Sequence, residues 1–141
     1  MDYVVLAGEL LNALHSLRKS SMQRHLDEAT QGEAFVLQII ARHEDHVLPG
    51  DIRNEMCVSS ARIAQALNSI EKKGWITRRI DTNDRRRIII HMTEEGKRAA
   101  EEHHRAILAL ASGMLSRLGE HDAREYIRIT GRLAGIIDSG A

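Results

Sequence analysis

Apolar residues near the N-terminus recur at steps of three and four. They are Tyr3, Leu6, Leu10, Leu14 and Leu17. This spacing is typical of a helix with one apolar face and predicts a helix over residues 3–23. A second helix is expected to begin at Thr30, because Thr30 and Glu33 have the spacing of a capping box, and to reach Arg42 through the apolar run 35–40.

Two shorter helices are expected next. Pro49 suits the first turn of a helix that reaches Met56, and Ser59 or Ser60 suits the N-cap of a helix that ends at Gly74. The apolar positions of this second helix lie at i, i+4 and i+7, and they are Ile63, Leu67 and Ile70. Its opposite face carries four polar side chains, Arg62, Gln65, Ser69 and Lys72. These four donors are expected to project together, away from the core.

After Gly74 the pattern changes from helix to strand. Residues 75–80 and 87–92 are predicted strands, and the turn-rich segment 81–86 between them makes the pair a β-hairpin. Thr93 is expected to cap a helix of about 25 residues that ends at Gly119, and a final helix is expected over about 121–138. The apolar positions of these last two helices are His103, Ile107, Leu110, Met114, Leu118, Tyr126, Ile127, Leu133, Ile136 and Ile137.

The composition excludes several classes of protein. A chain of 141 residues fits one domain, and its four aromatic residues are too few to stack successive bases as RRM and OB-fold proteins do. The single Cys57 excludes an intramolecular disulfide and fits a reducing cytoplasm. No stretch reaches the ~18 apolar residues of a membrane span, and the N-terminus does not have the pattern of a secretion signal. We therefore expect a mainly helical cytoplasmic protein with no membrane partner.

Positive charge is concentrated in one segment. The formal net charge of the chain is zero, but residues 62–87 hold eight basic and three acidic side chains, a local charge of +5. Two short helices, the second with a basic face, followed by an arginine-tipped hairpin describe a winged helix-turn-helix. The second helix would lie in the major groove of double-stranded DNA, where Arg62 and Gln65 contact base edges and Ser69 and Lys72 contact phosphate.

Three motifs make a resemblance specific. They are Val58-Ser59-Ser60 with Ile70-Glu71-Lys72-Lys73-Gly74-Trp75-Ile76-Thr77-Arg78, then Asp81-Thr82-Asn83-Asp84-Arg85-Arg86, then Met92-Thr93-Glu94-Glu95-Gly96. In their order and spacing these motifs, which lie between residues 58 and 96, resemble the MarR family of bacterial transcription regulators. The single departure is Met92, where that family usually has leucine, a conservative difference.

The resemblance implies an architecture and a set of contacts. It implies a DNA-binding region over 29–96, flanked by helical dimerisation regions 1–28 and 97–141. In the family an aspartate of the wing orients the arginine two positions later toward the minor groove, and Asp84 and Arg86 match that pair. The full expected DNA-binding set is Ser59, Ser60, Arg62, Gln65, Ser69, Lys72, Arg78, Asp84, Arg85, Arg86 and Arg87.

Two further partners are expected. The terminal helices carry more aliphatic residues than a winged core of about 60 residues can cover, which favours a homodimer that reads a palindromic operator. The resemblance also implies a small-molecule effector, an organic anion or an apolar aromatic, bound between the dimerisation helices and the winged region. No cofactor is expected.

Other functions fit the residues less well. Ser59, Ser60, His91 and Asp84 match no nucleophile setting, which argues against an enzyme. A metal-sensing member would use residues 43–46 with His103 and His104, but adjacent histidines point about 100° apart on a helix. A redox-sensing member would use Cys57. A winged helix that contacts an acidic protein instead of DNA is the alternative from another class.

Overall fold

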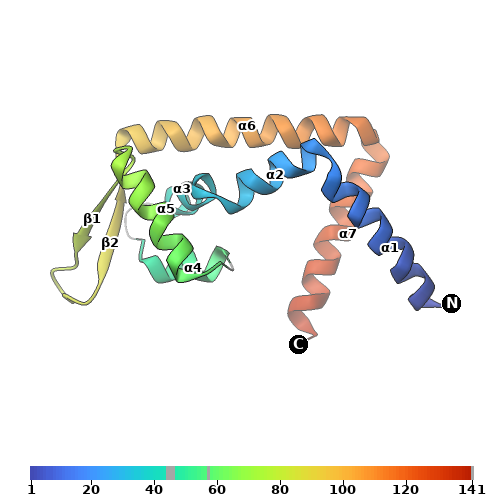
Figure 1. The fold of residues 1–141 in the computed structure, drawn as a ribbon, viewed down its shortest axis with the longest axis horizontal. Helices are drawn as coiled ribbons and strands as arrows, with labels where there is room; N and C mark the ends of the chain where they lie inside the picture. Colours follow the sequence, from blue (N-terminus) through green and yellow to red (C-terminus); the bar gives the residue numbers. More distant parts are fainter. Residues whose placement is uncertain (44–46, 57, 141) are drawn as a thin grey trace. The chain divides into compact units, whose positions relative to one another are not determined.

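The computed structural model describes residues 1–43, 47–56 and 58–140. Two compact units divide the chain, Met1–Ile107 and Leu108–Ala141. The elements in the described part are α1 (Tyr3–Lys19), α2 (Ser21–Gln31), α3 (Glu33–Arg42), α4 (Pro49–Met56), α5 (Ser60–Lys72), β1 (Ile76–Ile80), β2 (Ile88–Met92), α6 (Glu94–Leu118) and α7 (Glu120–Ser139), drawn in Figure 1. The expected fold, mainly helical with a two-stranded hairpin, is confirmed.

The N-terminal helix is shorter than its apolar pattern predicts. The prediction of one helix over 3–23 is wrong because Ser20 adopts an extended conformation and its hydroxyl accepts a hydrogen bond from the Gln23 amide at 3.1 Å, which starts α2. The predicted capping box is wrong as well. Thr30 lies inside α2, and Gly32 is the N-cap of α3, without a side-chain cap. At Ser20, the short hydroxyl side chain offers the backbone a hydrogen bond that competes with continuation of the helix.

The hydrophobic core lies between α3, α4, α5 and the hairpin. Its buried members are Val36, Leu37, Ile39, Ile40, Val47, Ile52, Ile63, Leu67, Ile70, Ile76, Ile90 and Ala100. Strands β1 and β2 pair antiparallel with Ile76 opposite Met92, and Val47 extends the ladder through a hydrogen bond from the Ile90 amide to its carbonyl at 2.9 Å. In Figure 1 the hairpin, which we call the wing (residues 76–92), projects beyond α4 and α5.

The base of the wing is tied to the start of α6. The Thr93 hydroxyl donates to the Gly74 carbonyl at 2.6 Å and accepts from the Gly96 amide at 3.0 Å, so the expected cap is present. The Thr93 amide donates to the Trp75 carbonyl at 3.0 Å. A Cβ at position 96 would lie 2.0 Å from that carbonyl oxygen, so only glycine permits this approach.

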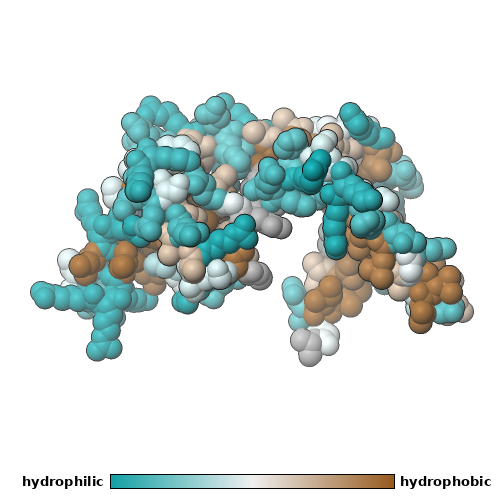
Figure 2. All heavy atoms as spheres, viewed as in Figure 1, coloured by the Kyte–Doolittle hydropathy of each residue, from teal (hydrophilic) through white to brown (hydrophobic). Residues whose placement is uncertain are grey.

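The terminal helices bury nothing. Neither α1 nor α7 contains a buried residue, although both carry large aliphatic side chains. Figure 2 shows hydrophobic side chains along α7 and near the start of α1. Within the described residues, no helix combines the length and apolar content that a membrane crossing needs.

Candidate nucleic-acid interface

Helix α5 presents the polar face that the sequence predicts, with one exception. Ser59 is the N-cap, and its hydroxyl accepts from the Arg62 amide at 3.3 Å. Ser60 is the first helical residue and accepts from Arg53 at 3.3 Å. The apolar side of the helix is buried as predicted, by Ile63, Leu67 and Ile70. The outward face is made of Ala61, Arg62, Ala64, Gln65, Asn68 and Lys72, all exposed.

Ser69 is the exception. It is half-buried, and it hydrogen-bonds to the carboxylate of Glu33 on α3, which also pairs with Lys73. Burial alone would raise the pKa of Glu33, but the hydrogen bonds from Lys73 and Ser69 outweigh it and lower the pKa. The Lys73 ammonium in turn lies 4.9 Å from the centroid of the Trp75 ring. Ser69 and Lys73 therefore connect α5 to α3.

Arg78 joins the wing to α5. From strand β1 its guanidinium donates to both oxygens of Glu71, at 2.9 and 3.1 Å, and to Oδ1 of Asn68 at 2.7 Å. The hydrogen bond from Arg78 lowers the pKa of Glu71, and the same bond raises the pKa of Arg78. The sequence predicts Arg78 as a DNA contact, but in this structure its guanidinium is engaged within the protein.

Asn68 is an outward residue that the sequence analysis missed. It lies three residues after Gln65 and four before Lys72, so helical spacing places it on the same face as both. Its neutral side chain gives no charge signal. The spacing alone was sufficient to find it.

The tip of the wing is shaped by two aspartates. The Asp81 carboxylate accepts from the Asn83 amide at 2.9 Å, and the Asp84 carboxylate accepts from the Arg86 amide at 3.0 Å. Asp84 thus binds the backbone amide of Arg86, and the Arg86 side chain is exposed. Throughout the part of the chain that the structure describes, no side chain pairs with the guanidinium groups of the three exposed arginines, Arg85, Arg86 and Arg87.

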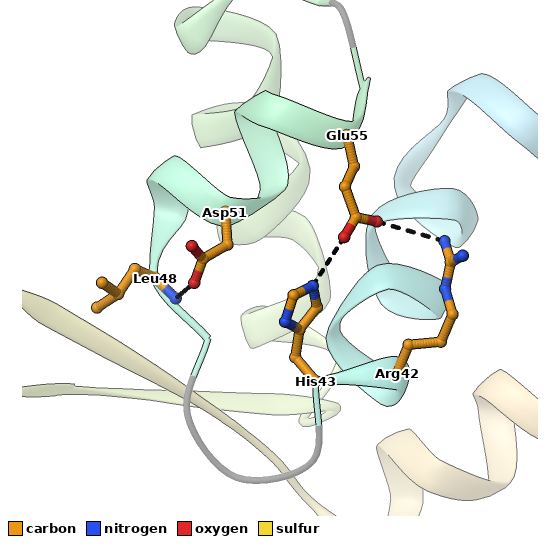
Figure 3. Close-up of polar contacts among 5 residues, drawn as sticks. All are labelled: Arg42, His43, Leu48, Asp51 and Glu55. Carbon is orange, nitrogen blue, oxygen red and sulfur yellow. Dashed lines mark hydrogen bonds and ion pairs between the residues drawn. The ribbon is translucent and has the colours of Figure 1, made fainter. Parts of the chain in front are cut away.

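Polar contacts also hold α4 against the end of α3 (Figure 3). The Glu55 carboxylate binds His43 Nε2 at 2.8 Å and lies 3.5 Å from Arg42, and Asp51 accepts from the Leu48 amide at 3.0 Å. No group of three or more potential metal ligands occurs among the residues described. The remaining candidates of the metal and redox alternatives, residues 44–46 and Cys57, lie outside the described residues.

A cleft opens where α3 and β2 meet the first half of α6. Its volume is about 480 Å³. The residues that line it are Gln38, Ala41, Met92, Lys97, Ala100, Glu101 and His104. Within this lining, the side-chain amide of Gln38 donates a hydrogen bond to the Ala100 carbonyl at 2.5 Å. On the same helix the Nε2 atom of half-buried His103 is buried and has no hydrogen-bond partner within the described structure.

Comparison with known proteins places this geometry in a family. The sequence profile of the MarR family matches residues 29–88. The HTH-type transcriptional regulator YwhA of Bacillus subtilis is 36% identical over 141 residues, which cover 95% of this chain and 99% of that protein. The HTH-type transcriptional repressor YetL of the same organism is 25% identical over 105 residues, 74% of this chain and 63% of YetL. The crystal structure of FabT from Streptococcus pneumoniae in complex with DNA superposes with a TM-score of 0.65 at 20% identity, covering 99% and 100% of the two chains.

Proposed function

Because this chain belongs to the MarR family of transcriptional regulators, we propose that it is a ligand-responsive repressor that binds a palindromic operator as a homodimer. The observation that carries the proposal is that the chain has two basic surfaces, both of them exposed. One is the outward face of α5, and the other is the tip of the wing with its exposed Arg85, Arg86 and Arg87. A relative named as a repressor, YetL, supports repression over activation.

In the proposed complex, α5 lies in the major groove. Arg62 and Gln65 have the donors and acceptors that bidentate recognition of base edges requires, and Lys72 supplies a cation for phosphate. Ser59 and Ser60 stand at the N-terminus of the helix, where free amides and the helix dipole favour a phosphate. Ser69 was predicted as a phosphate contact, and its engagement with Glu33 makes it the weakest member of the proposed set.

The wing is proposed to enter the minor groove. A narrow minor groove has a strongly negative potential, which favours an inserted arginine. Asp84 fixes the backbone amide of Arg86 at 3.0 Å, and we infer that this contact aims the guanidinium of Arg86 along the groove. Arg85 and Arg87 then lie on either side for phosphate contacts.

Exposed apolar surface supports the homodimer. On α1, Leu10 and Leu11 are 58% and 65% exposed, and on α7, Leu133 and Ile137 are 55% and 63% exposed. Apolar surface of this extent is unfavourable in water and marks a protein interface. A second copy of the chain, related by a two-fold axis, supplies matching aliphatic helices and aligns two α5 helices with two half-sites.

The effector is proposed to bind in the cleft beside α6. Met92 and Ala100 give it apolar walls, and Lys97 and His104, beside Glu101, give it an ammonium group and an imidazole N–H donor, which suits an organic anion with an apolar body. Such a ligand changes DNA affinity only if it binds the free and DNA-bound forms differently. A mobility-shift screen of aromatic carboxylates against the Lys97→Met variant tests this, and release from DNA that is equal in wild type and variant would contradict the cleft assignment.

Selection of bound duplexes from a random pool tests DNA recognition itself. We expect enrichment of an inverted repeat whose half-sites lie about one helical turn apart, with affinity that falls steeply as salt rises. Arg62→Ala should relax the preference at one base pair per half-site, whereas Arg105→Ala, on the exposed side of α6, serves as a matched loss of charge. Enrichment of no sequence would favour the alternative of a protein-interaction module.

A further inference from the structure

We propose that Asn68 reads a base in the major groove, and that Arg78 determines which atoms of the Asn68 amide face the DNA. The inference rests on the proposed placement of α5 in that groove. It assigns to Asn68 a role in specificity and to Arg78 the role of a positioning residue. Neither role follows from charge, because Asn68 is neutral and the guanidinium of Arg78 is paired within the protein.

The location of Asn68 is the first step. Asn68 is exposed, and with Gln65 and Lys72 it occupies the outward face of α5 at spacings of three and four residues. The inward-facing neighbours Leu67 and Ile70 are buried. A helix that lies in the groove with Gln65 toward the bases therefore brings Asn68 toward the same groove, one turn further along.

The chemistry of Arg78 fixes the orientation of the amide. A guanidinium has five N–H donors and no acceptor, so the Asn68 atom that it binds at 2.7 Å must be the oxygen Oδ1. The two atoms of a planar amide lie on opposite branches, so the NH₂ group points away from Arg78. Flipping the amide would set the NH₂ group against donors and lose the bond.

Arg78 is itself held firmly. Two hydrogen bonds to Glu71, at 2.9 and 3.1 Å, form a bidentate pair, which is more directional than a single contact. Its backbone belongs to β1, where Arg78 is opposite the buried Ile90 of β2. The sheet and the helix together therefore orient Asn68, and the orientation exists before DNA binds.

This orientation selects a kind of base edge. Bidentate recognition of adenine needs an amide that accepts from N6 and donates to N7. The oxygen of Asn68 is engaged by Arg78, and its outward group is a donor, so it complements an edge made of acceptors. Guanine, with O6 and N7, presents such an edge in the major groove. We therefore expect a guanine at the base pair that Asn68 contacts.

The experiment compares operator preferences of four variants, using duplexes enriched by the wild-type protein. Asn68→Asp keeps the shape and an oxygen for Arg78 but removes the donors. We expect it to lose about 5- to 30-fold of the preference for guanine at one base pair per half-site, and Asn68→Ala to lose the preference at the same pair. Arg78→Met frees the amide to rotate, so adenine should become acceptable at that pair alone. Thr77→Ala, an exposed neighbour on β1, should retain the wild-type profile.

Two results would overturn the inference. If Asn68→Asp and Asn68→Ala keep the wild-type base preferences, Asn68 does not read the DNA. If Arg78→Met weakens binding to all duplexes equally and lowers the salt slope by about one, Arg78 is a phosphate contact instead. Asn68→Asp preserves the pair with Arg78, so it decides the question even where Arg78→Met unfolds. Failure of the wild type to enrich any sequence is a different result, which overturns the proposed function and this inference together.

Discussion

Helices α3 and α7 carry similar aliphatic side chains in opposite environments. On α3, Leu37, Ile39 and Ile40 are at most 1% exposed, whereas on α7, Leu133 and Ile136 are 55% and 54% exposed. Burial of an aliphatic side chain contributes about 1.5 to 3 kcal/mol. The winged region therefore completes its core within one chain, whereas the terminal helices leave large aliphatic side chains exposed. In the proposed homodimer, stability and assembly depend on different parts of the molecule, so substitutions can separate them.

The largest effect is expected in the core of the winged region. Ile39 is 0% exposed, so Ile39→Ala leaves a cavity and should lower the free energy of unfolding by about 2 to 5 kcal/mol. Ile80 on β1 is 67% exposed, and Ile80→Ala should cost about 0.5 kcal/mol or less. Urea unfolding at fixed protein concentration measures both, and equal losses would refute the contrast between the two environments.

Substitutions in the terminal helices should weaken dimerisation. Leu10→Asp places a charge on the apolar face of α1 and should weaken dimerisation by about 30-fold or more, roughly 2 kcal/mol. Asn12→Asp adds the same charge on the other side of that helix and is the matched control. Light scattering over a concentration series measures the mass. A wild-type mass of 15.9 kDa, the mass of one chain, would sink the homodimer.

Substitutions at the exposed tip of the wing should change neither the stability of the fold nor the mass of the assembly. Arg86→Ala should weaken operator binding by about 1 to 3 kcal/mol. Removal of the Asp84 carboxylate would strengthen binding if only its repulsion of DNA mattered. We expect Asp84→Ala to weaken binding, because the Arg86 amide loses its acceptor at 3.0 Å. Thr82→Ala is the control, and a titration in which Arg86→Ala and Asp84→Ala both match the wild type would remove the wing from the mechanism.

The smallest expected effect concerns pH. The pKa of Glu33 lies below its usual range in the folded protein, so the unfolded chain binds more protons as the pH falls. The stabilisation that Glu33 gives is therefore complete near pH 7 and is lost as the pH falls through and below about 4. Glu33→Gln should cost about 1 kcal/mol or less at pH 7 and nothing in acid. Thermal melts at pH 7 and in acid measure this difference, and Glu102→Gln, at an exposed position on α6, is the control.

The sequence predicts elements whose periodicity is enforced by burial. Ile63, Leu67 and Ile70 lie at helical spacing because one side of α5 faces the core, and the hairpin follows from a run of turn residues. The break at Ser20 was not predictable in the same way. The apolar stripe of α1 continues to Leu17, and only a local competition between the Ser20 hydroxyl and the helical backbone ends it.

The candidate interface was predictable where its side chains have no partner among the residues that the structure describes. The arginines of the wing tip are exposed, as their position in a polar turn indicates. Ser69 and Arg78 differ because their partners come from other elements. Glu33 precedes Ser69 by 36 positions, and the Arg78 contact with Glu71 links a strand to a helix. Local spacing contains no information about such pairings, which arise only when the elements pack.

The hydrogen bond between Thr93 and Gly74 closes a loop of 19 positions around the wing. Because this closure fixes both ends of the hairpin, the length of the tip is set independently of the fold beneath it. Each doubling of a loop costs only about 0.6 kcal/mol in closure entropy. The tip of the wing is therefore replaceable: a tip of different length or charge can be grafted between residues 80 and 88, and in the proposed complex this changes the reach into the minor groove and leaves α5 in place.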